Sequence, residues 1–183
     1  MKKSEDQPFS YPVKVGHISA NPVTVKIAAD AAECRLLAGQ WDVLEVKGFA
    51  AEFEIRRWKK DGVRLKGRVA TEIVQTCVVT LEPVASTIDE PIDAIFVPEG
   101  SKLARAPLSD TGEMLLDPDG PDSPEIFHGD TIDVGAVAAE YAAMAIDPYP
   151  RKDGAAFSAH VESTEADDAK PSPFAALKDW KKS

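Results

Sequence analysis

Two long segments of alternating apolar and polar residues meet at Asp61-Gly62. Because successive side chains of a β-strand point to opposite faces, this alternation predicts strands with one apolar and one polar side. Asp-Gly between two such segments is a strong hairpin signal. The first segment, Val43 to Trp58, places Phe49, Ala51, Phe53 and Ile55 on one side and Glu52, Glu54, Arg56 and Trp58 on the other. A long antiparallel hairpin is therefore expected at the centre of the fold.

The segment after the turn continues the alternation. Its apolar side holds Val63, Leu65, Val69, Thr71, Ile73, Gln75 and Cys77, and its polar side holds Arg64, Lys66 and Arg68. A third segment, Thr87 to Val97, lies between Pro83 and Pro98 and is predicted to pair as an outer strand. Val13–Ile18 and Val23–Ile27 are shorter strand candidates on either side of a turn at Asn21-Pro22.

Two segments change to helical spacing. The first follows Asp30, a residue suited to cap a helix, and Gly39 is expected to end it. The second is predicted from Asp130-Thr131 through about Ala145, before Pro148. Strands followed by helices on their apolar side indicate the α+β class. The expected fold is an antiparallel β meander, or a partly closed sheet, packed by one or two helices.

The remaining segments are polar, acidic or rich in proline. Residues 1–12 are predicted to be flexible, residues 13–150 to form a single domain, and 98–129 to be a long acidic loop or linker within it. Residues 151–183 are predicted to be a disordered tail that carries a short amphipathic motif at 173–182. Phe174, Leu177 and Trp180 would dock that motif on its own domain or, as we favour, in the groove of a partner protein.

The charge of the chain is unevenly distributed. The net charge is −10, which argues against general attraction to a phosphate backbone. One stretch nevertheless carries seven basic residues against the single acid Asp61, which leaves 14 basic and 30 acidic residues elsewhere. These cations are Arg56, Arg57, Lys59, Lys60, Arg64, Lys66 and Arg68, with Trp58 among them.

Like charges on one ribbon repel, so two interpretations follow. Either Glu52, Glu54 and Glu72 act as cross-strand partners, or an anionic partner molecule supplies the missing charge. An exposed indole beside arginines would favour RNA, because bases stack on aromatic side chains.

No catalytic or metal-binding pattern is present. His17, His128 and His160 lie far apart, and the chain lacks both a phosphate-binding glycine loop and a Gly-x-Ser-x-Gly nucleophile motif. Cys77 is interpreted first as an inward-facing strand residue and second as a nucleophile or ligand, whereas Cys34 is interpreted as packing. We therefore expect no enzyme activity, no cofactor and no metal. With no signal peptide, no membrane segment and only two cysteines, a cytoplasmic location is expected.

Two motifs resemble those of a known family. Val74-Gln-Thr-Cys77-Val-Val-Thr80-Leu-Glu-Pro83-Val is similar to a signature containing Cys-x-x-Cys-Leu-x-Pro. Asp130 to Glu140, followed by Ala145-Ile-Asp-Pro148-Tyr-Pro150-Arg, is similar to a second signature with an acidic helix start and a proline-containing end. In this order, over residues 10 to 155, the motifs resemble the YceD family of large ribosomal RNA subunit accumulation proteins. The positions that match are Cys77, Leu81, Pro83, Asp133 and Pro148.

This resemblance implies a non-enzymatic role in ribosome biogenesis, in the accumulation of large-subunit ribosomal RNA. The second cysteine of the signature is Thr80 here, so zinc binding is not expected, because a tetrahedral site needs four ligands. Three hypotheses stay open. The chain binds ribosomal RNA or a pre-ribosomal particle through the basic hairpin; it is an acidic adaptor for a basic ribosomal protein or another assembly factor; or, with least support, it is an enzyme that uses Cys77.

Overall fold

The computed structural model describes residues 8–16, 18, 21–104 and 123–156 of the chain. All helices and strands within these ranges belong to one compact unit, Met1–Lys152. The tail motif of Phe174, Leu177 and Trp180 lies outside the described residues.

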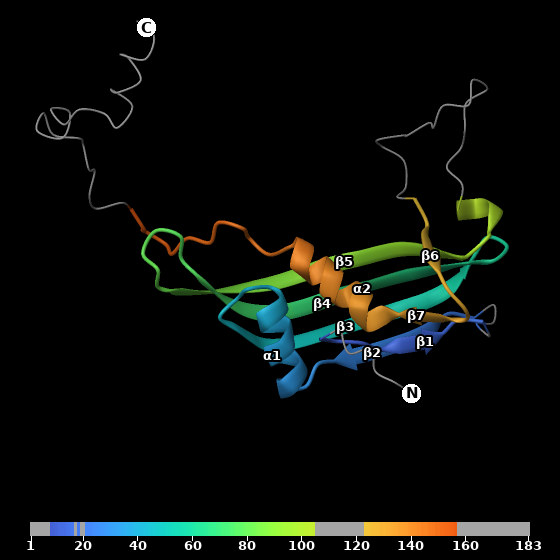
Figure 1. Ribbon diagram of the computed structural model, residues 1–183, viewed down its shortest axis with the longest axis horizontal. Helices are drawn as coiled ribbons and strands as arrows, with labels where there is room; N and C mark the ends of the chain where they lie inside the picture. The colour runs from blue at the N-terminus through green and yellow to red at the C-terminus, as the bar shows by residue number, and fades with distance from the viewer. Residues whose placement is uncertain (1–7, 17, 19–20, 105–122, 157–183) are drawn as a thin grey trace, which may run out of the picture. The chain divides into compact units, whose positions relative to one another are not determined.

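A five-stranded sheet forms the centre of the unit (Figure 1). Its order is β2-β3-β4-β5-β6, and every pairing is antiparallel except that between β5 and β6. The strands are β2 (Val23–Ala28), β3 (Glu45–Trp58), β4 (Gly62–Thr76), β5 (Pro83–Pro98) and β6 (Glu125–Phe127). Two short strands, β1 (Pro12–Lys14) and β7 (Thr131–Asp133), pair separately. The α+β prediction is confirmed, and the sheet is open rather than partly closed.

The alternation in β3 and β4 produces the expected two faces. Phe53, Ile55, Leu65, Val69 and Ile73 have no exposed surface. Two helices, α1 (Ala31–Gln40) and α2 (Val134–Met144), lie over this apolar face of the sheet, and their buried side chains join the same core (Figure 1). The opposite face keeps its charged side chains at the surface.

Helix α1 begins as its sequence predicts. Asp30 accepts hydrogen bonds from the amides of Ala32 and Glu33 at 2.7 and 2.8 Å, and the Glu33 carboxylate accepts from the Asp30 amide at 3.0 Å. This reciprocal capping box satisfies amides that no helical carbonyl can reach. The predicted end at Gly39 is wrong, because the helix continues to Gln40 and the left-handed backbone position is Asp42, at φ 53°.

Helix α2 begins later than predicted. Thr131–Asp133 does not open the helix but forms β7, which pairs with β1. Asp133 is the N-cap, and its carboxylate accepts from the Ala136 amide at 3.0 Å, from the Tyr11 amide at 2.8 Å and from the Ser10 hydroxyl at 2.5 Å. The long-range pairing with residues 10–14 therefore overrides the local helical pattern.

Three boundaries also differ from expectation. Phe9, within the segment predicted to be flexible, is buried in the core, and β1 ends at Lys14 rather than at Ile18. The predicted loop 98–129 contains a short 3-10 helix at Lys102–Ala104 as well as β6, and its residues 105–122 lie outside the described part. Because β6 is three residues long and pairs in parallel with a distant strand, it leaves no alternating pattern in the sequence.

Candidate functional site

Acidic side chains from β5 neutralise the cations in the middle of the polar sheet face. Arg64 donates from Nε and Nη2 to both carboxylate oxygens of Asp93, each at 2.6 Å. Lys66 Nζ lies 3.3 Å from the same carboxylate, and Arg68 pairs with Asp89. The hydrogen bond from Arg64 lowers the pKa of Asp93 below its ordinary value, against the opposing effect of burial. Three of the seven cations are therefore already compensated within the fold.

The compensating acids differ from those expected. Glu72 lies 2.7 Å from Lys47, and Glu52 lies 3.1 Å from Lys26, so these two glutamates pair with cations outside the basic stretch. The register between β4 and β5 sets Lys66 opposite Asp93 and Ala70 opposite Asp89, which brings both aspartates among the cations of β4. The alternating pattern of β3 and β4 cannot reveal these two aspartates, because they lie on β5, which pairs with the other edge of β4.

The end of the β3–β4 hairpin is different, and we call Arg56–Asp61 the hairpin tip. Arg56 lies directly opposite Arg64, and such like-charge pairs are unfavourable. Arg64 is satisfied by Asp93, whereas Arg56, Arg57, Lys59 and Lys60 form no ion pair with any residue that the structure describes. The hairpin tip thus carries four cations against one acid, Asp61.

Trp58 lies at the centre of the hairpin tip and is half-buried. Its indole rests on Gly62, where an added Cβ would come within 2.7 Å of Trp58 Cε3. Lys59 Nζ lies 4.2 Å from the ring centroid, and Lys59 itself has a left-handed backbone at φ 51°. The indole therefore lies close against the backbone of Gly62, and the Lys59 ammonium lies over its ring.

Cys77 lies just beyond β4, in a turn that meets the segment after α2. Its side chain has no exposed surface, and Sγ accepts from the amides of Val79, Thr80 and Lys152, each at 3.4 Å. The Val78 amide donates to Pro150 O at 2.9 Å, and Lys152 Nζ pairs with Glu82 at 2.8 Å. Cys77 is buried, as the alternation predicts, and its sulfur also contacts two loops that are far apart in the chain.

These donors favour the thiolate. A hydrogen bond from the Thr80 side chain, followed by the amides of Lys152 and Thr80, lowers the pKa of Cys77 from its ordinary 9.0 to about 6. Since the pKa is lower in the folded chain, the thiolate stabilises the fold fully above pH 9, and this contribution is lost as the pH falls through about 6.

We expect the denaturant midpoint of the parent chain to fall between pH 9 and pH 6 by more than that of Cys77→Ser. A Cys34→Ser variant is the control and should keep the parent pH dependence, because burial raises the pKa of Cys34. Equal pH dependence in the parent and Cys77→Ser would contradict the assignment of a thiolate.

The other family-motif positions surround the same loops or cap α2. Pro83 begins β5, Asp133 caps α2, and Pro148 lies in the segment that meets the Cys77 turn. Leu81 has a left-handed backbone at φ 59° and a side chain that is 77% exposed. Cys77, Leu81 and Pro83 follow the end of β4, so they lie at the opposite end of the β3–β4 pair from the hairpin tip (Figure 1).

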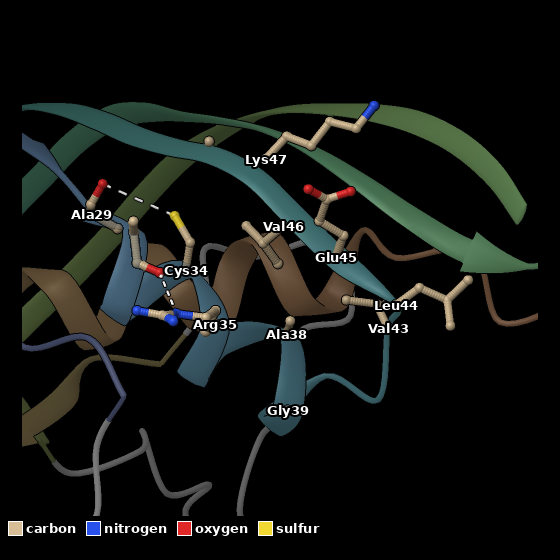
Figure 2. A pocket seen from close by; sticks show the side chains of 12 residues that line it. Ala29, Cys34, Arg35, Ala38, Gly39, Val43, Leu44, Glu45, Val46 and Lys47 are labelled. Atoms are coloured by element: carbon tan, nitrogen blue, oxygen red, sulfur yellow. Dashed lines mark hydrogen bonds between the residues drawn. The ribbon is translucent and has the colours of Figure 1, made fainter.

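A groove of about 810 Å³ lies between α1 and the start of β3 (Figure 2). In Figure 2, Val46 points toward α1, whereas Leu44 points away from it. Cys34 lines the groove with its Sγ 4.0 Å from Ala29 O, and burial raises the pKa of this thiol. Cys34 is therefore a neutral packing residue.

The described residues contain no group of three or more His, Cys, Asp or Glu side chains that could hold a metal ion. Within the same ranges, neither helix has the length and apolarity needed to cross a bilayer.

Comparison with known proteins identifies a family. Searches of curated proteins and of solved structures find no match to the chain. The family model described as large ribosomal RNA subunit accumulation protein YceD matches residues 65–181, well over half of the chain. The matched range begins just after the hairpin tip and includes the Cys77 turn, α2 and the segment around Pro148. The chain therefore belongs to the YceD family, whose name ties it to the accumulation of large-subunit ribosomal RNA.

Proposed function

We propose that this protein is a cytoplasmic, non-enzymatic ribosome-biogenesis factor that binds ribosomal RNA of the large subunit, or a precursor particle containing it, through the hairpin tip. Membership of the YceD family supports a role in the accumulation of large-subunit ribosomal RNA. The tip lies outside the range that the family model matches, so its role rests on charge and geometry alone. The observation that carries it is that four cations around a half-buried indole have no ion-pair partner within the described chain.

The contrast between the tip and the sheet face narrows the proposed site. Arg64, Lys66 and Arg68 are held by Asp89 and Asp93, so a phosphate would have to displace a carboxylate to reach them. No such exchange is needed at the four cations of the hairpin tip, Arg56, Arg57, Lys59 and Lys60. Phosphate contacts supply most of the affinity of a protein for RNA, so these four cations are the favoured contacts. On a chain of net charge −10, a local cluster of this kind also restricts where an anionic backbone can approach.

Trp58 would add contacts with the bases. A base stacked on an aromatic side chain contributes about 1–3 kcal/mol without strong sequence preference. Lys59 now covers the ring, and its long flexible side chain would turn aside toward a phosphate when a base takes its place. The indole already lies close against the backbone at Gly62, so a side chain at this position would displace the ring on which that base would stack.

We expect Trp58→Ala to weaken binding to purified large-subunit ribosomal RNA by about tenfold, and Trp58→Phe to restore most of it. Fluorescence anisotropy with labelled RNA fragments at fixed salt measures this. Tyr149→Ala removes an aromatic side chain that is 71% exposed at the opposite end of the sheet and is the matched control. Equal affinity of the parent and Trp58→Ala would remove the indole from the proposed site.

A further inference from the structure

The hairpin tip extends past the neighbouring strand on one side of the sheet. β2 begins at Val23, which pairs with Ile55, so no strand in the described part of the chain pairs with the outer edge of Arg56–Trp58. On the other side β5 continues along β4, and an added Cβ at Gly62 would lie 3.2 Å from Phe96 O. The tip is therefore a two-stranded ribbon with one edge that no described strand covers.

The cations of the hairpin tip lie on different sides of this ribbon. Side chains alternate along a strand and Ile55 has no exposed surface, so Arg56 lies on the polar side of β3 and Arg57 on the apolar side. Arg57 is nevertheless exposed, and Lys59 and Lys60 extend the positive charge around the turn. Phosphates that contact all four cations must therefore approach the ribbon from both faces and from its end.

A stiff RNA duplex does not match this arrangement. Its phosphates lie in fixed rows, so a duplex that rests on one face of the ribbon reaches Arg56 or Arg57 but not both. Neither groove admits the ribbon, since the major groove of A-form RNA is deep and narrow and its minor groove is shallow. A single strand can rotate about its backbone bonds and bend around the tip, so it can contact both arginines and the turn.

Trp58 adds a second reason to expect an unpaired nucleotide. It lies two residues after Arg56, on the same polar side of β3, and the Lys59 ammonium lies 4.2 Å from its ring centroid. An ammonium at that distance occupies the place where a base would stack. The bases of a continuous duplex are already stacked on their neighbours, so only an unpaired base is free to take this place.

The sheet face behind the hairpin tip does not extend the attraction for RNA. Arg64 and Lys66 pair with Asp93, and Arg68 pairs with Asp89. Such pairs of opposite charge give little net field beyond a Debye length of about 8 Å at physiological ionic strength. A long duplex would therefore gain little from lying along this face, whereas a few nucleotides at the tip reach all of the unpaired cations.

We propose that the hairpin tip selects unpaired RNA, either a single strand or a bulged nucleotide, over continuous duplex. This inference rests on the proposed function and adds which structure of RNA the tip recognises. The unpaired base would stack on Trp58 in place of the Lys59 ammonium, and the phosphates on either side of it would contact Arg56 and Arg57 on the two faces of the ribbon. The selectivity is for the structure of the RNA rather than for its sequence.

The test compares one labelled RNA strand alone and in a duplex. A fluorescein-labelled RNA of about 12 nucleotides is titrated with the full chain at fixed physiological salt, before and after it is annealed to its unlabelled complement. We expect the parent to bind the single strand at least about tenfold more tightly than the duplex, because only the single strand offers a base to the indole. Charge alone predicts the reverse, because each phosphate contact releases more counterion from a double helix than from a single strand.

Three variants connect this preference to the indole. Trp58→Ala should remove the preference, by weakening single-strand binding about tenfold while changing duplex binding less than about twofold. Trp58→Phe, which keeps an aromatic ring, should keep most of the preference. Tyr149→Ala, at the opposite end of the sheet, is the matched control and should bind both RNAs as the parent does. A duplex that contains one unpaired adenosine should recover most of the affinity of the single strand.

The outcomes separate this inference from the proposed function. Equal or tighter binding of the continuous duplex by the parent, or a preference that survives in Trp58→Ala, would overturn the inference and leave RNA binding at the hairpin tip in place. Absence of RNA binding by the parent would overturn the proposed function itself. So would RNA binding that is unchanged when the four cations of the hairpin tip are replaced by glutamine.

Discussion

Replacing Arg56, Arg57, Lys59 and Lys60 with glutamine should lower the affinity for large-subunit ribosomal RNA by roughly a hundredfold or more at physiological salt. Counterion release makes each phosphate contact worth about fivefold in affinity at that ionic strength, and the contributions of four contacts multiply. The slope of log affinity against log salt should also become shallower by about 3, since each contact contributes about 0.7 to 0.9. Filter binding or anisotropy across a salt series measures both quantities.

The control for this variant has the same change in net charge. Glutamine at Lys14, Lys26, Lys47 and Arg151 removes four cations outside the basic stretch, two of which already pair with Glu52 and Glu72. We expect this control to lose only a few-fold in affinity, through the general field. Equal losses in the two variants would show that total charge, and not the hairpin tip, governs binding.

Gly67→Ala should destabilise the fold by about 3 kcal/mol, or about 10 °C in Tm. An added Cβ at Gly67 would overlap the carbonyl oxygen of Glu52 and lie 2.8 Å from Phe53 Cδ1. Phe53 has no exposed surface, so its ring cannot move without opening the core. Chemical denaturation of the parent and the variant measures the difference in the free energy of unfolding.

Gly39→Ala is the matched control, and it should change the free energy of unfolding in the opposite direction. Gly39 lies within α1, and nothing is within 4 Å of its added Cβ. Alanine is the better helix former, so this variant should be stabilised by roughly 0.5 kcal/mol near the helix end. If Gly67→Ala were as stable as the parent, the close approach of β3 and β4 at this point would be wrong.

Local patterns predicted the hairpin and the start of α1 well. Alternation over β3 and β4 indicated both faces, and Asp61-Gly62 marked the turn between them. The Asp30 cap with Glu33 three residues later is a complete local signal, and the structure contains both hydrogen bonds. Such features depend on residues close in sequence, so the chain alone reveals them.

Long-range contacts account for the places where the structure differs from what the sequence predicts. Thr131–Asp133 has a helical neighbourhood but pairs with Pro12–Lys14, more than a hundred residues earlier. The aspartates that neutralise Arg64 and Arg68 lie on β5, and the Lys152 amide that reaches Cys77 comes from 75 residues later. No spacing rule within one element reveals such partners.

The most direct test of the central claim is site-specific photo-crosslinking in cells, followed by sequencing of the attached RNA. A photoreactive residue at Lys60, in the hairpin tip, should crosslink to a few defined positions in large-subunit ribosomal RNA. The same residue at Lys26, on the polar sheet face, should give few or no such crosslinks. Crosslinks from Lys60 that were absent, that fell on unrelated RNAs, or that matched those from Lys26 would contradict the account.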